Sequence, residues 1–314
     1  MLSRLADSLF WLNRYMERAD GLLRTMKTNY ILSLDKGINS NLTWRPVLEI
    51  FTTLPDADIH RLENDTGATL HYLLTDTNNH NSLKAILIKA RENARGVQDH
   101  ITKEVWEQVN EMYHMINYPS TSASLSGYDT LQTIENFSKN CLLFMGITDV
   151  TMPRGLGWSF MNLGKYIERC TQTNEIADRQ YRSIDYKMEN EIDIVQWQYL
   201  LLSLSGFELH LKTYRSSSHN KNVLHQVLLN EDFTRSILYS LNRIDKYLDD
   251  VINENRSDTN DDLVRFFGRL HSYIKYIDFE KLGEGEHLER SLQQVRVNIL
   301  EFSRYLTRNF FSYS

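Results

Sequence analysis

The chain has 314 residues, of which 41% are hydrophobic and 24% charged, a composition that excludes an intrinsically disordered protein. Its 13 glycines and 4 prolines compare with roughly 22 and 16 expected from average usage, so turns are scarce and long helices are favoured over many short strands. The net charge of −6 argues against a general nucleic-acid-binding protein, which carries a basic surface.

The first predicted helix covers about residues 5–30. Its apolar residues recur at alternating steps of four and three, namely Leu5, Leu9, Leu12, Met16, Ala19, Leu23, Met26 and Tyr30. This spacing predicts an amphipathic helix that packs on other helices. A break is expected near Gly37 and Asn39, and a shorter helix around Trp44 and Phe51.

Further helices follow in chain order. Pro55 predicts a helix start, and the polar residues 76–79 predict a loop that ends in a cap. A long helix is expected to carry the apolar stripe from Leu83 to Ile101, and to continue or restart beyond it. Residues 119–126 predict a linker, and Leu131 begins the next helix.

A short charged signature occurs twice. Residues 14–18 read Arg-Tyr-Met-Glu-Arg and residues 165–169 read Lys-Tyr-Ile-Glu-Arg, so the Glu-Arg steps lie 168 − 17 = 151 positions apart. Further residues match between the halves, such as Ser82 and Ser236, at an offset that rises to 236 − 82 = 154. Insertions in the loops of the second half would produce this rise of three residues. We therefore predict an all-α, multi-helix bundle built from two homologous helical halves, residues 1–152 and 153–314, with approximate internal two-fold symmetry. The short link between them favours one continuous globular body over two independent bundles.

The signature is open to two interpretations. On an ideal helix Glu17 and Arg18 lie about 120–140° from the centre of the apolar stripe, on the side of Arg14. One interpretation is a solvent-exposed face in which Arg14 and Glu17 pair. The other is a functional site or a buried charge network, because an exposed face should have drifted between the halves, whereas Glu168 and Arg169 repeat it.

A second charged cluster lies at Arg91, Glu92 and Arg95. Arg91 and Arg95 are one helical turn apart, and like charges at this spacing slightly destabilise a helix unless something compensates. Their counterparts at the offset of 154 are Asp245 and Asp249. The pairs either face one another across the halves as salt bridges, or Arg91 and Arg95 form an anion site present in the first half only.

The remaining motifs exclude classes of protein and do not identify a function. Glu111 and His114 have the Glu-x-x-His spacing of helical di-iron sites, but the second half offers no matching pair. Phosphate-loop, dinucleotide and nucleophile-elbow motifs are missing from the sequence, so we expect no metal and no cofactor. Cys141 and Cys170 are too few for a disulfide framework and indicate a cytoplasmic compartment. No stretch reaches the roughly 18 apolar residues that a membrane helix needs, so no membrane association is expected.

Three stretches resemble the bacterial alpha-E family, which is named for its helices and its Glu-Arg motif. They are residues 1–6 leading into the first signature, residues 90–95, and residues 154–158 leading into the second signature. The resemblance covers essentially the whole chain. One departure is a proline that the family pattern places near Asn81, which this chain lacks.

The resemblance implies a partner and a process. Members of the family accompany, or are fused to, a circularly permuted ATP-grasp protein, often beside a transglutaminase-like protease. This implies an accessory protein in peptide (amide-bond) ligation that presents a carboxylate, an amine or a peptide to the ligase. The residues expected to bind the anion or substrate are Arg14, Arg18, Arg91, Glu92, Arg95 and Arg169, and those expected to orient it or act in catalysis are Glu17 and Glu168.

Two alternatives stay open beside the accessory role, so the chain is not assigned as an enzyme. In one, a helical enzyme uses Glu17 or Glu168 as the general base in a cleft. In the other, the protein is purely structural, and Glu17 with Arg169 and Glu168 with Arg18 form salt bridges between the halves.

Overall fold

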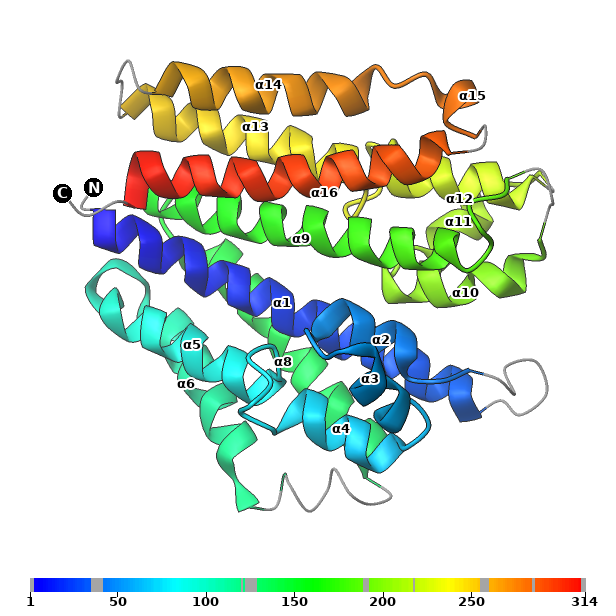
Figure 1. Cartoon of the computed structure of the whole chain (residues 1–314). Helices are drawn as coiled ribbons and strands as arrows, with labels where there is room; N and C mark the ends of the chain where they lie inside the picture. Colours follow the sequence, from blue (N-terminus) through cyan, green and yellow to red (C-terminus); the bar gives the residue numbers. More distant parts are fainter. Residues whose placement is uncertain are drawn as a thin grey trace. The chain divides into compact units, whose positions relative to one another are not determined.

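A computed structural model describes residues 3–34, 42–119, 121, 129–188, 192–216, 218–254, 260–283 and 286–311 (Figure 1). Every regular element in these ranges is a helix and none is a strand, which confirms the all-α prediction. The break expected near Gly37 and Asn39, and most of the linker expected at residues 119–126, lie outside these ranges.

The chain divides into two compact units. The N-terminal unit comprises residues 11–154, and the C-terminal unit comprises residues 155–314 together with residues 1–10. Helix α1 (Ser3–Leu34) therefore begins in the C-terminal unit and continues into the N-terminal unit.

The N-terminal unit continues after α1 with short helices and then three longer ones. They are α2 (Arg45–Phe51), α3 (Asp56–Leu62), α4 (Thr66–Leu74), α5 (Leu83–Gly96), the 3-10 turn η1 (Gln98–His100), α6 (Lys103–Asn117) and α8 (Thr130–Thr151). Helix α6 packs against both α5 and α8, and α2 packs against α3 and α4.

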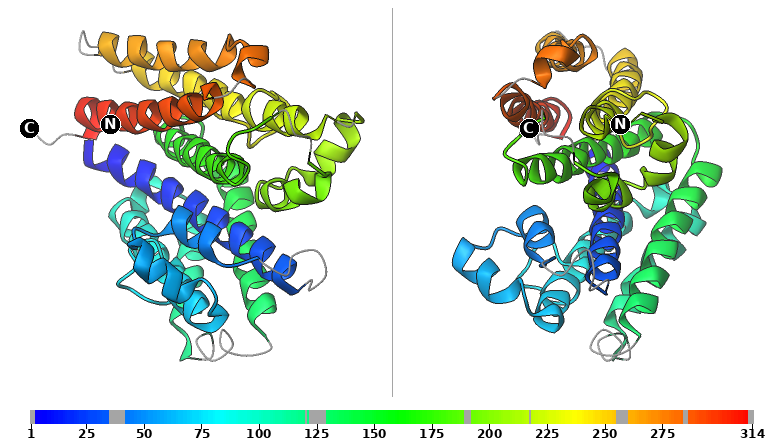
Figure 2. Two further views of the ribbon diagram at one scale, coloured as in Figure 1. Left: turned by 45° about the vertical axis from the view of Figure 1, so that its right-hand side comes forward. Right: turned by 90° about the vertical axis from the view of Figure 1, so that its right-hand side faces the viewer.

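The C-terminal unit is built on long helices that run side by side in both views of Figure 2. Its elements are α9 (Leu156–Arg182), α10 (Ile194–Ser203), α11 (Phe207–Thr213), α12 (His219–Leu228), α13 (Ile237–Glu254), α14 (Asn260–Lys275), α15 (Phe279–Leu282), α16 (His287–Leu306) and the π-helical turn η2 (Thr307–Phe311). Helix α9 packs against α13 and α16, and α14 packs against the same two helices.

The helix expected between Leu83 and Ile101 is shorter than predicted. Helix α5 ends at Gly96, and α6 starts after Thr102, whose hydroxyl accepts a hydrogen bond from the Val105 amide. Glycine is a poor helix former and is common at helix ends, while threonine is a favoured N-terminal cap. The continuous apolar stripe therefore spans more than one helix. The alternative prediction, that a second helix starts beyond Ile101, is confirmed by α6.

Helix α1 and helix α9 are buried around most of their circumference rather than along one stripe. Besides its apolar residues, α1 buries Asn13, Arg14, Glu17, Asp20, Thr25, Thr28 and Asn29, and α9 buries Asn162, Glu168, Arg169, Gln172, Thr173, Asn174 and Asp178. A helix with one packed face leaves such polar residues in water. The amphipathic pattern thus identified both helices correctly as helices but underestimated how deeply they are buried.

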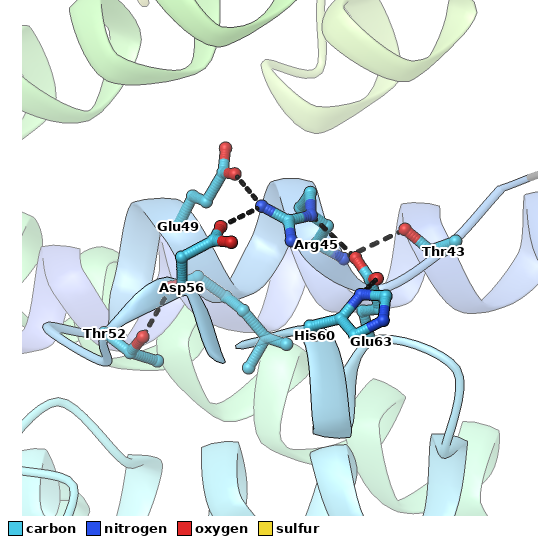
Figure 3. A network of polar contacts seen from close by, with 8 residues as sticks. Thr43, Arg45, Glu49, Thr52, Asp56, His60 and Glu63 are labelled. Carbon is cyan, nitrogen blue, oxygen red and sulfur yellow. Dashed lines mark hydrogen bonds and ion pairs between the residues drawn. The ribbon is translucent and has the colours of Figure 1, made fainter. Parts of the chain in front are cut away.

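An arginine cluster fixes α2 against α3 in the N-terminal unit (Figure 3). The Arg45 Nε atom donates to Glu63 (2.7 Å), and its Nη1 atom donates to Asp56 (2.6 Å) and Glu49 (3.1 Å). The second carboxylate oxygen of Glu63 lies 2.7 Å from His60 Nδ1. The Arg45 guanidinium lowers the pKa of Glu63. This pairing opposes the rise that burial of the Glu63 carboxylate would otherwise cause. We interpret this cluster as structural support, because a single guanidinium joins carboxylates from α2, from α3 and from the residue that follows α3.

Candidate functional site

The two copies of the signature are mostly buried. Glu17 is 1% exposed, Glu168 is 4% exposed, and Arg14 and Arg169 are each 6% exposed. Arg18 is half-buried. A solvent-exposed face is therefore wrong for four of these five residues, because their helices are enclosed on nearly all sides. The interpretation as a buried charge network is the one that agrees with this burial.

In the first copy, the arginine contacts the loop that leads into α5. The Arg18 Nη1 atom donates to the side-chain oxygen of Asn81 at 3.2 Å. The next residue, Ser82, caps α5 by accepting a hydrogen bond from the Ala85 amide. Arg18 thus helps to position the start of the helix that carries Arg91 and Arg95.

In the second copy, the arginine contacts the loop that leads into α13. The Arg169 Nη1 atom donates to the carbonyl oxygen of Thr234 at 3.2 Å. Two residues later the Ser236 hydroxyl accepts from the Tyr239 amide in the first turn of α13. The same kind of anchor therefore occurs once in each unit.

The signature tyrosines lie beside cations in both units. The guanidinium of Arg18 and the ammonium of Lys89 lie 5.7 and 5.8 Å from the Tyr15 ring centre. In the C-terminal unit Arg169 lies 5.2 Å from the Tyr166 ring. Burial raises the pKa of Tyr166 to about 12, although Arg169 opposes this rise. Tyr166 therefore stays a neutral aromatic platform at physiological pH.

Two tryptophans also make corresponding contacts. The indole N–H of Trp44 donates to the Thr66 hydroxyl at 3.1 Å, and that of Trp197 donates to the Asn220 side chain at 3.2 Å. The tryptophans are 197 − 44 = 153 positions apart and their acceptors 220 − 66 = 154 positions apart. These offsets match those found in the sequence.

Glu17 lies close to a buried thiol within the N-terminal unit. Burial raises the pKa of Cys141, and the carboxylates of Asp20 and Glu17 raise it further, while Arg24 opposes them. Arg24 forms an ion pair with Asp20. Cys141 is a neutral, buried thiol and is not set up as a nucleophile.

Arg91 is the most distinctive of the predicted site residues. Its guanidinium carbon lies 4.4 Å from the Tyr113 ring centre and 5.7 Å from that of Trp106. Its Nε atom donates to the Asn110 side chain at 2.7 Å. Within the described ranges no carboxylate pairs with Arg91, and neither of its Nη atoms makes a hydrogen bond. The half-buried guanidinium is therefore held in place at one edge while its fork remains available for a ligand.

Two further cations share the face of α5 that carries Arg91. Lys84 lies about 20° from both Arg91 and Arg95 around the helix axis, and these two arginines are about 40° apart. Neither forms an ion pair with any residue that the structure describes. Glu92 is exposed and lies about 100° from Arg91, so it does not belong to this cationic stripe. We call Lys84, Arg91 and Arg95 the α5 stripe.

The partners of Arg91 on α6 were missed by sequence reasoning. Trp106, Asn110 and Tyr113 follow one another at steps of four and three and therefore share one face of α6. Of the acidic residues of α6, Glu104 and Glu111 lie about 130° or more from the centre of this face, and Glu107 lies about 90° from it. This aromatic and amide stripe was visible in the sequence, but nothing there paired it with Arg91.

The aspartates that correspond to Arg91 and Arg95 lie in the C-terminal unit. Asp245 lies 3.9 Å from His271 Nδ1, and Asp249 is exposed. Burial, followed by the nearby charges of Asp245 and Asp250, raises the pKa of Asp249. Salt bridges between these aspartates and the α5 stripe stay a prediction.

The described residues include neither a cluster of metal-ligating side chains nor a helix that could span a membrane. No three histidine, cysteine, aspartate or glutamate side chains gather there as a group that could hold a metal, and Glu111 and His114 are both exposed. No helix in the same part of the chain combines the length and apolar character needed to cross a bilayer.

These features define an all-helical protein with a Glu-Arg signature in each unit and a cationic stripe in one of them. Residues 1–311 match the sequence profile of Alpha-E, described as a predicted alpha-helical domain with a conserved ER motif. The chain belongs to the Alpha-E family. Neither a curated protein nor a solved structure matches the chain.

Proposed function

We propose that the chain is an accessory protein that binds a carboxylate-bearing substrate on the α5 stripe and presents it to an ATP-grasp amide ligase. The observation that carries the proposal is Arg91, whose guanidinium is oriented by Asn110, Trp106 and Tyr113 but is not neutralised by a carboxylate within the described ranges.

The chemistry of this arrangement favours a carboxylate ligand. A guanidinium fork matches the two oxygens of a carboxylate, and a fork that is already oriented loses less entropy on binding. Arg95 lies one turn along the helix and Lys84 two turns away, so the α5 stripe adds a positive potential around Arg91. Amide ligation needs a carboxylate that is activated and an amine that attacks it, and the α5 stripe suits the first of these.

The Glu-Arg signature supports this site without taking part in chemistry. Arg18 positions the loop before α5, and Tyr15 lies beside Lys89 of the same helix. Glu17 and Glu168 are 1% and 4% exposed, and buried carboxylates are retained mainly where they pair with cations, which favours a role in neutralising arginines over a role as general base. Arg14 and Arg169 are assigned the same supporting role.

We also propose that the two halves arose by duplication and retain approximate two-fold symmetry. The signature arginines, the tryptophan hydrogen bonds and the serine caps recur at offsets between 151 and 154. The cationic stripe is not repeated, since α13 carries Asp245 and Asp249 where α5 carries Arg91 and Arg95. One half thus keeps the ligand site, while the signature supports both.

The resemblance to the alpha-E family supports our proposals for the partner and the compartment. We propose that a circularly permuted ATP-grasp protein of a bacterial peptide-ligation system is the partner, and that both work in the cytoplasm, where ATP is available. The ligand is the carboxylate component of the ligation, a free acid or a peptide.

The test is ATP consumption by that ATP-grasp protein, measured with candidate carboxylate and amine substrates. Turnover should require this chain, and Arg91→Ala should lower it at least tenfold at low carboxylate concentration, with recovery when the carboxylate is raised. Arg265→Ala, which removes an exposed arginine of α14, is the matched control and should have no effect.

Two outcomes would contradict the proposal. If the chain neither binds the ligase nor changes its turnover, the accessory role is wrong. If a folded Glu17→Gln variant abolishes turnover at every carboxylate concentration while Arg91→Ala does not alter it, the enzyme alternative is favoured instead.

A further inference from the structure

Three tyrosines and an arginine gather between α9 and α13 in the C-terminal unit. The ring centre of Tyr166 on α9 lies 6.2 Å from that of Tyr239 and 6.0 Å from that of Tyr247, which both belong to α13. Arg243 lies midway between these two α13 tyrosines in sequence, so all three share one face of the helix. Its guanidinium carbon lies 5.0 Å from the Tyr239 ring centre.

Arg243 is held at one nitrogen, while its other nitrogens are open. Its Nη2 atom donates to the Tyr239 hydroxyl at 3.0 Å, and this contact raises the pKa of Arg243. Within the described ranges no carboxylate pairs with Arg243, and its Nε and Nη1 atoms make no hydrogen bond. The half-buried guanidinium is thus oriented by a neutral partner and keeps its charge and one edge for a ligand.

Tyr166 brings an unused hydroxyl to the same cluster. It is only 8% exposed, yet its hydroxyl makes no hydrogen bond with any residue that the structure describes. Buried hydroxyls normally have a partner. Burial raises the pKa of Tyr166 to about 12, so at neutral pH this hydroxyl keeps its proton and can donate it. The Tyr239 hydroxyl, which accepts from Arg243, also retains a proton to donate.

Lys246 adds a second cation on this side of α13. It lies about 60° from Arg243 around the helix axis and less than one turn along it. Lys246 is exposed and forms no ion pair in the part of the chain that the structure describes. Two cations without a carboxylate partner therefore lie close together. We call Tyr166, Tyr239, Arg243 and Lys246 the α13 cluster.

The aspartates of α13 do not neutralise these cations. Asp245 and Asp249 lie about 160° and 120° from Arg243 around the helix axis, on other faces. Asp250 shares the face of Arg243 but lies about two turns further along α13, where it accepts a hydrogen bond from the Ser159 hydroxyl at 3.2 Å. The α13 cluster is therefore a place where an anion gains charge partners.

We propose that the α13 cluster is a second ligand site, separate from the α5 stripe, and that it binds the phosphate group of a small phosphate monoester or of inorganic phosphate. A phosphate group carries a charge of about −1.5 to −2 at pH 7 and offers three acceptor oxygens. The two cations match this charge. The open edge of Arg243 and the hydroxyls of Tyr166 and Tyr239 supply a donor for each oxygen. A carboxylate, with one charge and two oxygens, would leave a cation and a donor unused.

Isothermal titration calorimetry of the full chain tests the proposal with three ligands: inorganic phosphate, glycerol 3-phosphate and acetate. Both phosphates should bind, and acetate should bind at least tenfold more weakly. Of the two phosphates, the one that binds more tightly shows whether an ester or free phosphate is the ligand.

Substitutions in the α13 cluster separate binding from folding. Tyr166→Phe removes a hydroxyl that bonds to no described residue, so the melting temperature should stay that of the wild-type chain while the phosphate dissociation constant rises about threefold or more. Arg243→Ala should raise this constant at least tenfold. If Arg243→Ala lowers the melting temperature, Lys246→Ala replaces it, since Lys246 is exposed and its loss should cost about threefold.

Arg91→Ala is the matched control, because it removes the anion-binding arginine of the α5 stripe. Phosphate should bind to this variant as it does to the wild-type chain. Phosphate binding that is lost in Arg91→Ala, or that is unchanged in both Arg243→Ala and Lys246→Ala, would overturn the proposal, as would no phosphate binding at millimolar concentration. The proposed carboxylate site depends on Arg91 and not on Arg243, so either proposal can fail without the other.

Discussion

Gly164→Ala should severely destabilise the C-terminal unit. A Cβ atom at Gly164 would lie 2.1 Å from the carbonyl oxygen of Phe10, a distance that real Cβ contacts essentially never show, and 3.0 Å from its carbonyl carbon. The obstacle is backbone, so a side-chain rotation cannot relieve it. The start of α1 would have to move away from α9, which disturbs the contact between the Phe10 and Phe311 rings. We expect a loss of about 4 kcal/mol or more, or failure to fold.

Gly268→Ala is the control for this prediction. Gly268 also lies within a helix, but a Cβ atom there meets nothing within 4 Å. Alanine is a better helix former than glycine, so this change should leave stability unchanged or raise it by up to about 1 kcal/mol. Thermal and urea unfolding of the two variants measures the difference. If both melt close to the wild-type chain, the close approach of α1 to α9 at Phe10 is wrong.

Asn220→Ala should cost about 3 kcal/mol, because it leaves several buried groups unsatisfied. Asn220 is fully buried, and its side-chain oxygen accepts from the Trp197 indole (3.2 Å) and from the Ile192 amide (3.4 Å). Its side-chain nitrogen donates to the Met188 carbonyl at 3.2 Å. Alanine removes all three contacts and offers no replacement.

The corresponding residue of the N-terminal unit provides the comparison. Thr66 accepts a single hydrogen bond from Trp44 and is exposed, so water can replace its hydroxyl in Thr66→Ala. We expect a loss below about 1 kcal/mol. Urea unfolding of both variants tests the contrast. Equal losses would mean that the two tryptophan contacts contribute alike despite their different burial.

Local patterns predicted the elements of this protein well. The stripe of residues 5–30 and the turn at Pro55 lie where expected, because periodicity and turn chemistry depend on neighbours in sequence. The cap expected at residues 76–79 lies later, at Ser82. The burial of Glu17 could not be predicted in this way. A helical wheel assumes one packed face, whereas α1 is enclosed on nearly all sides.

Only part of the candidate site could be predicted from the sequence. Arg91 and Arg95 stood out because like charges on one helix face require an explanation. The side chains that orient Arg91 belong to α6, and their pairing depends on how α5 and α6 pack. Sequence spacing gives the face of each helix but not its neighbour, so Trp106, Asn110 and Tyr113 were missed.

The most direct measurement is the binding of a carboxylate ligand to the purified chain. We would titrate a short glutamate peptide at low salt and follow the intrinsic tryptophan fluorescence, to which Trp106, beside Arg91, contributes as one of five tryptophans. The wild-type chain should bind, Arg91→Ala should weaken binding at least tenfold, or about 1.4 kcal/mol, and Arg91→Lys should not restore it because lysine lacks the fork. Arg265→Ala should bind like the wild-type chain. If Arg91→Ala binds as tightly as the wild-type chain, or if no carboxylate binds at millimolar concentration, the α5 stripe is not the ligand site.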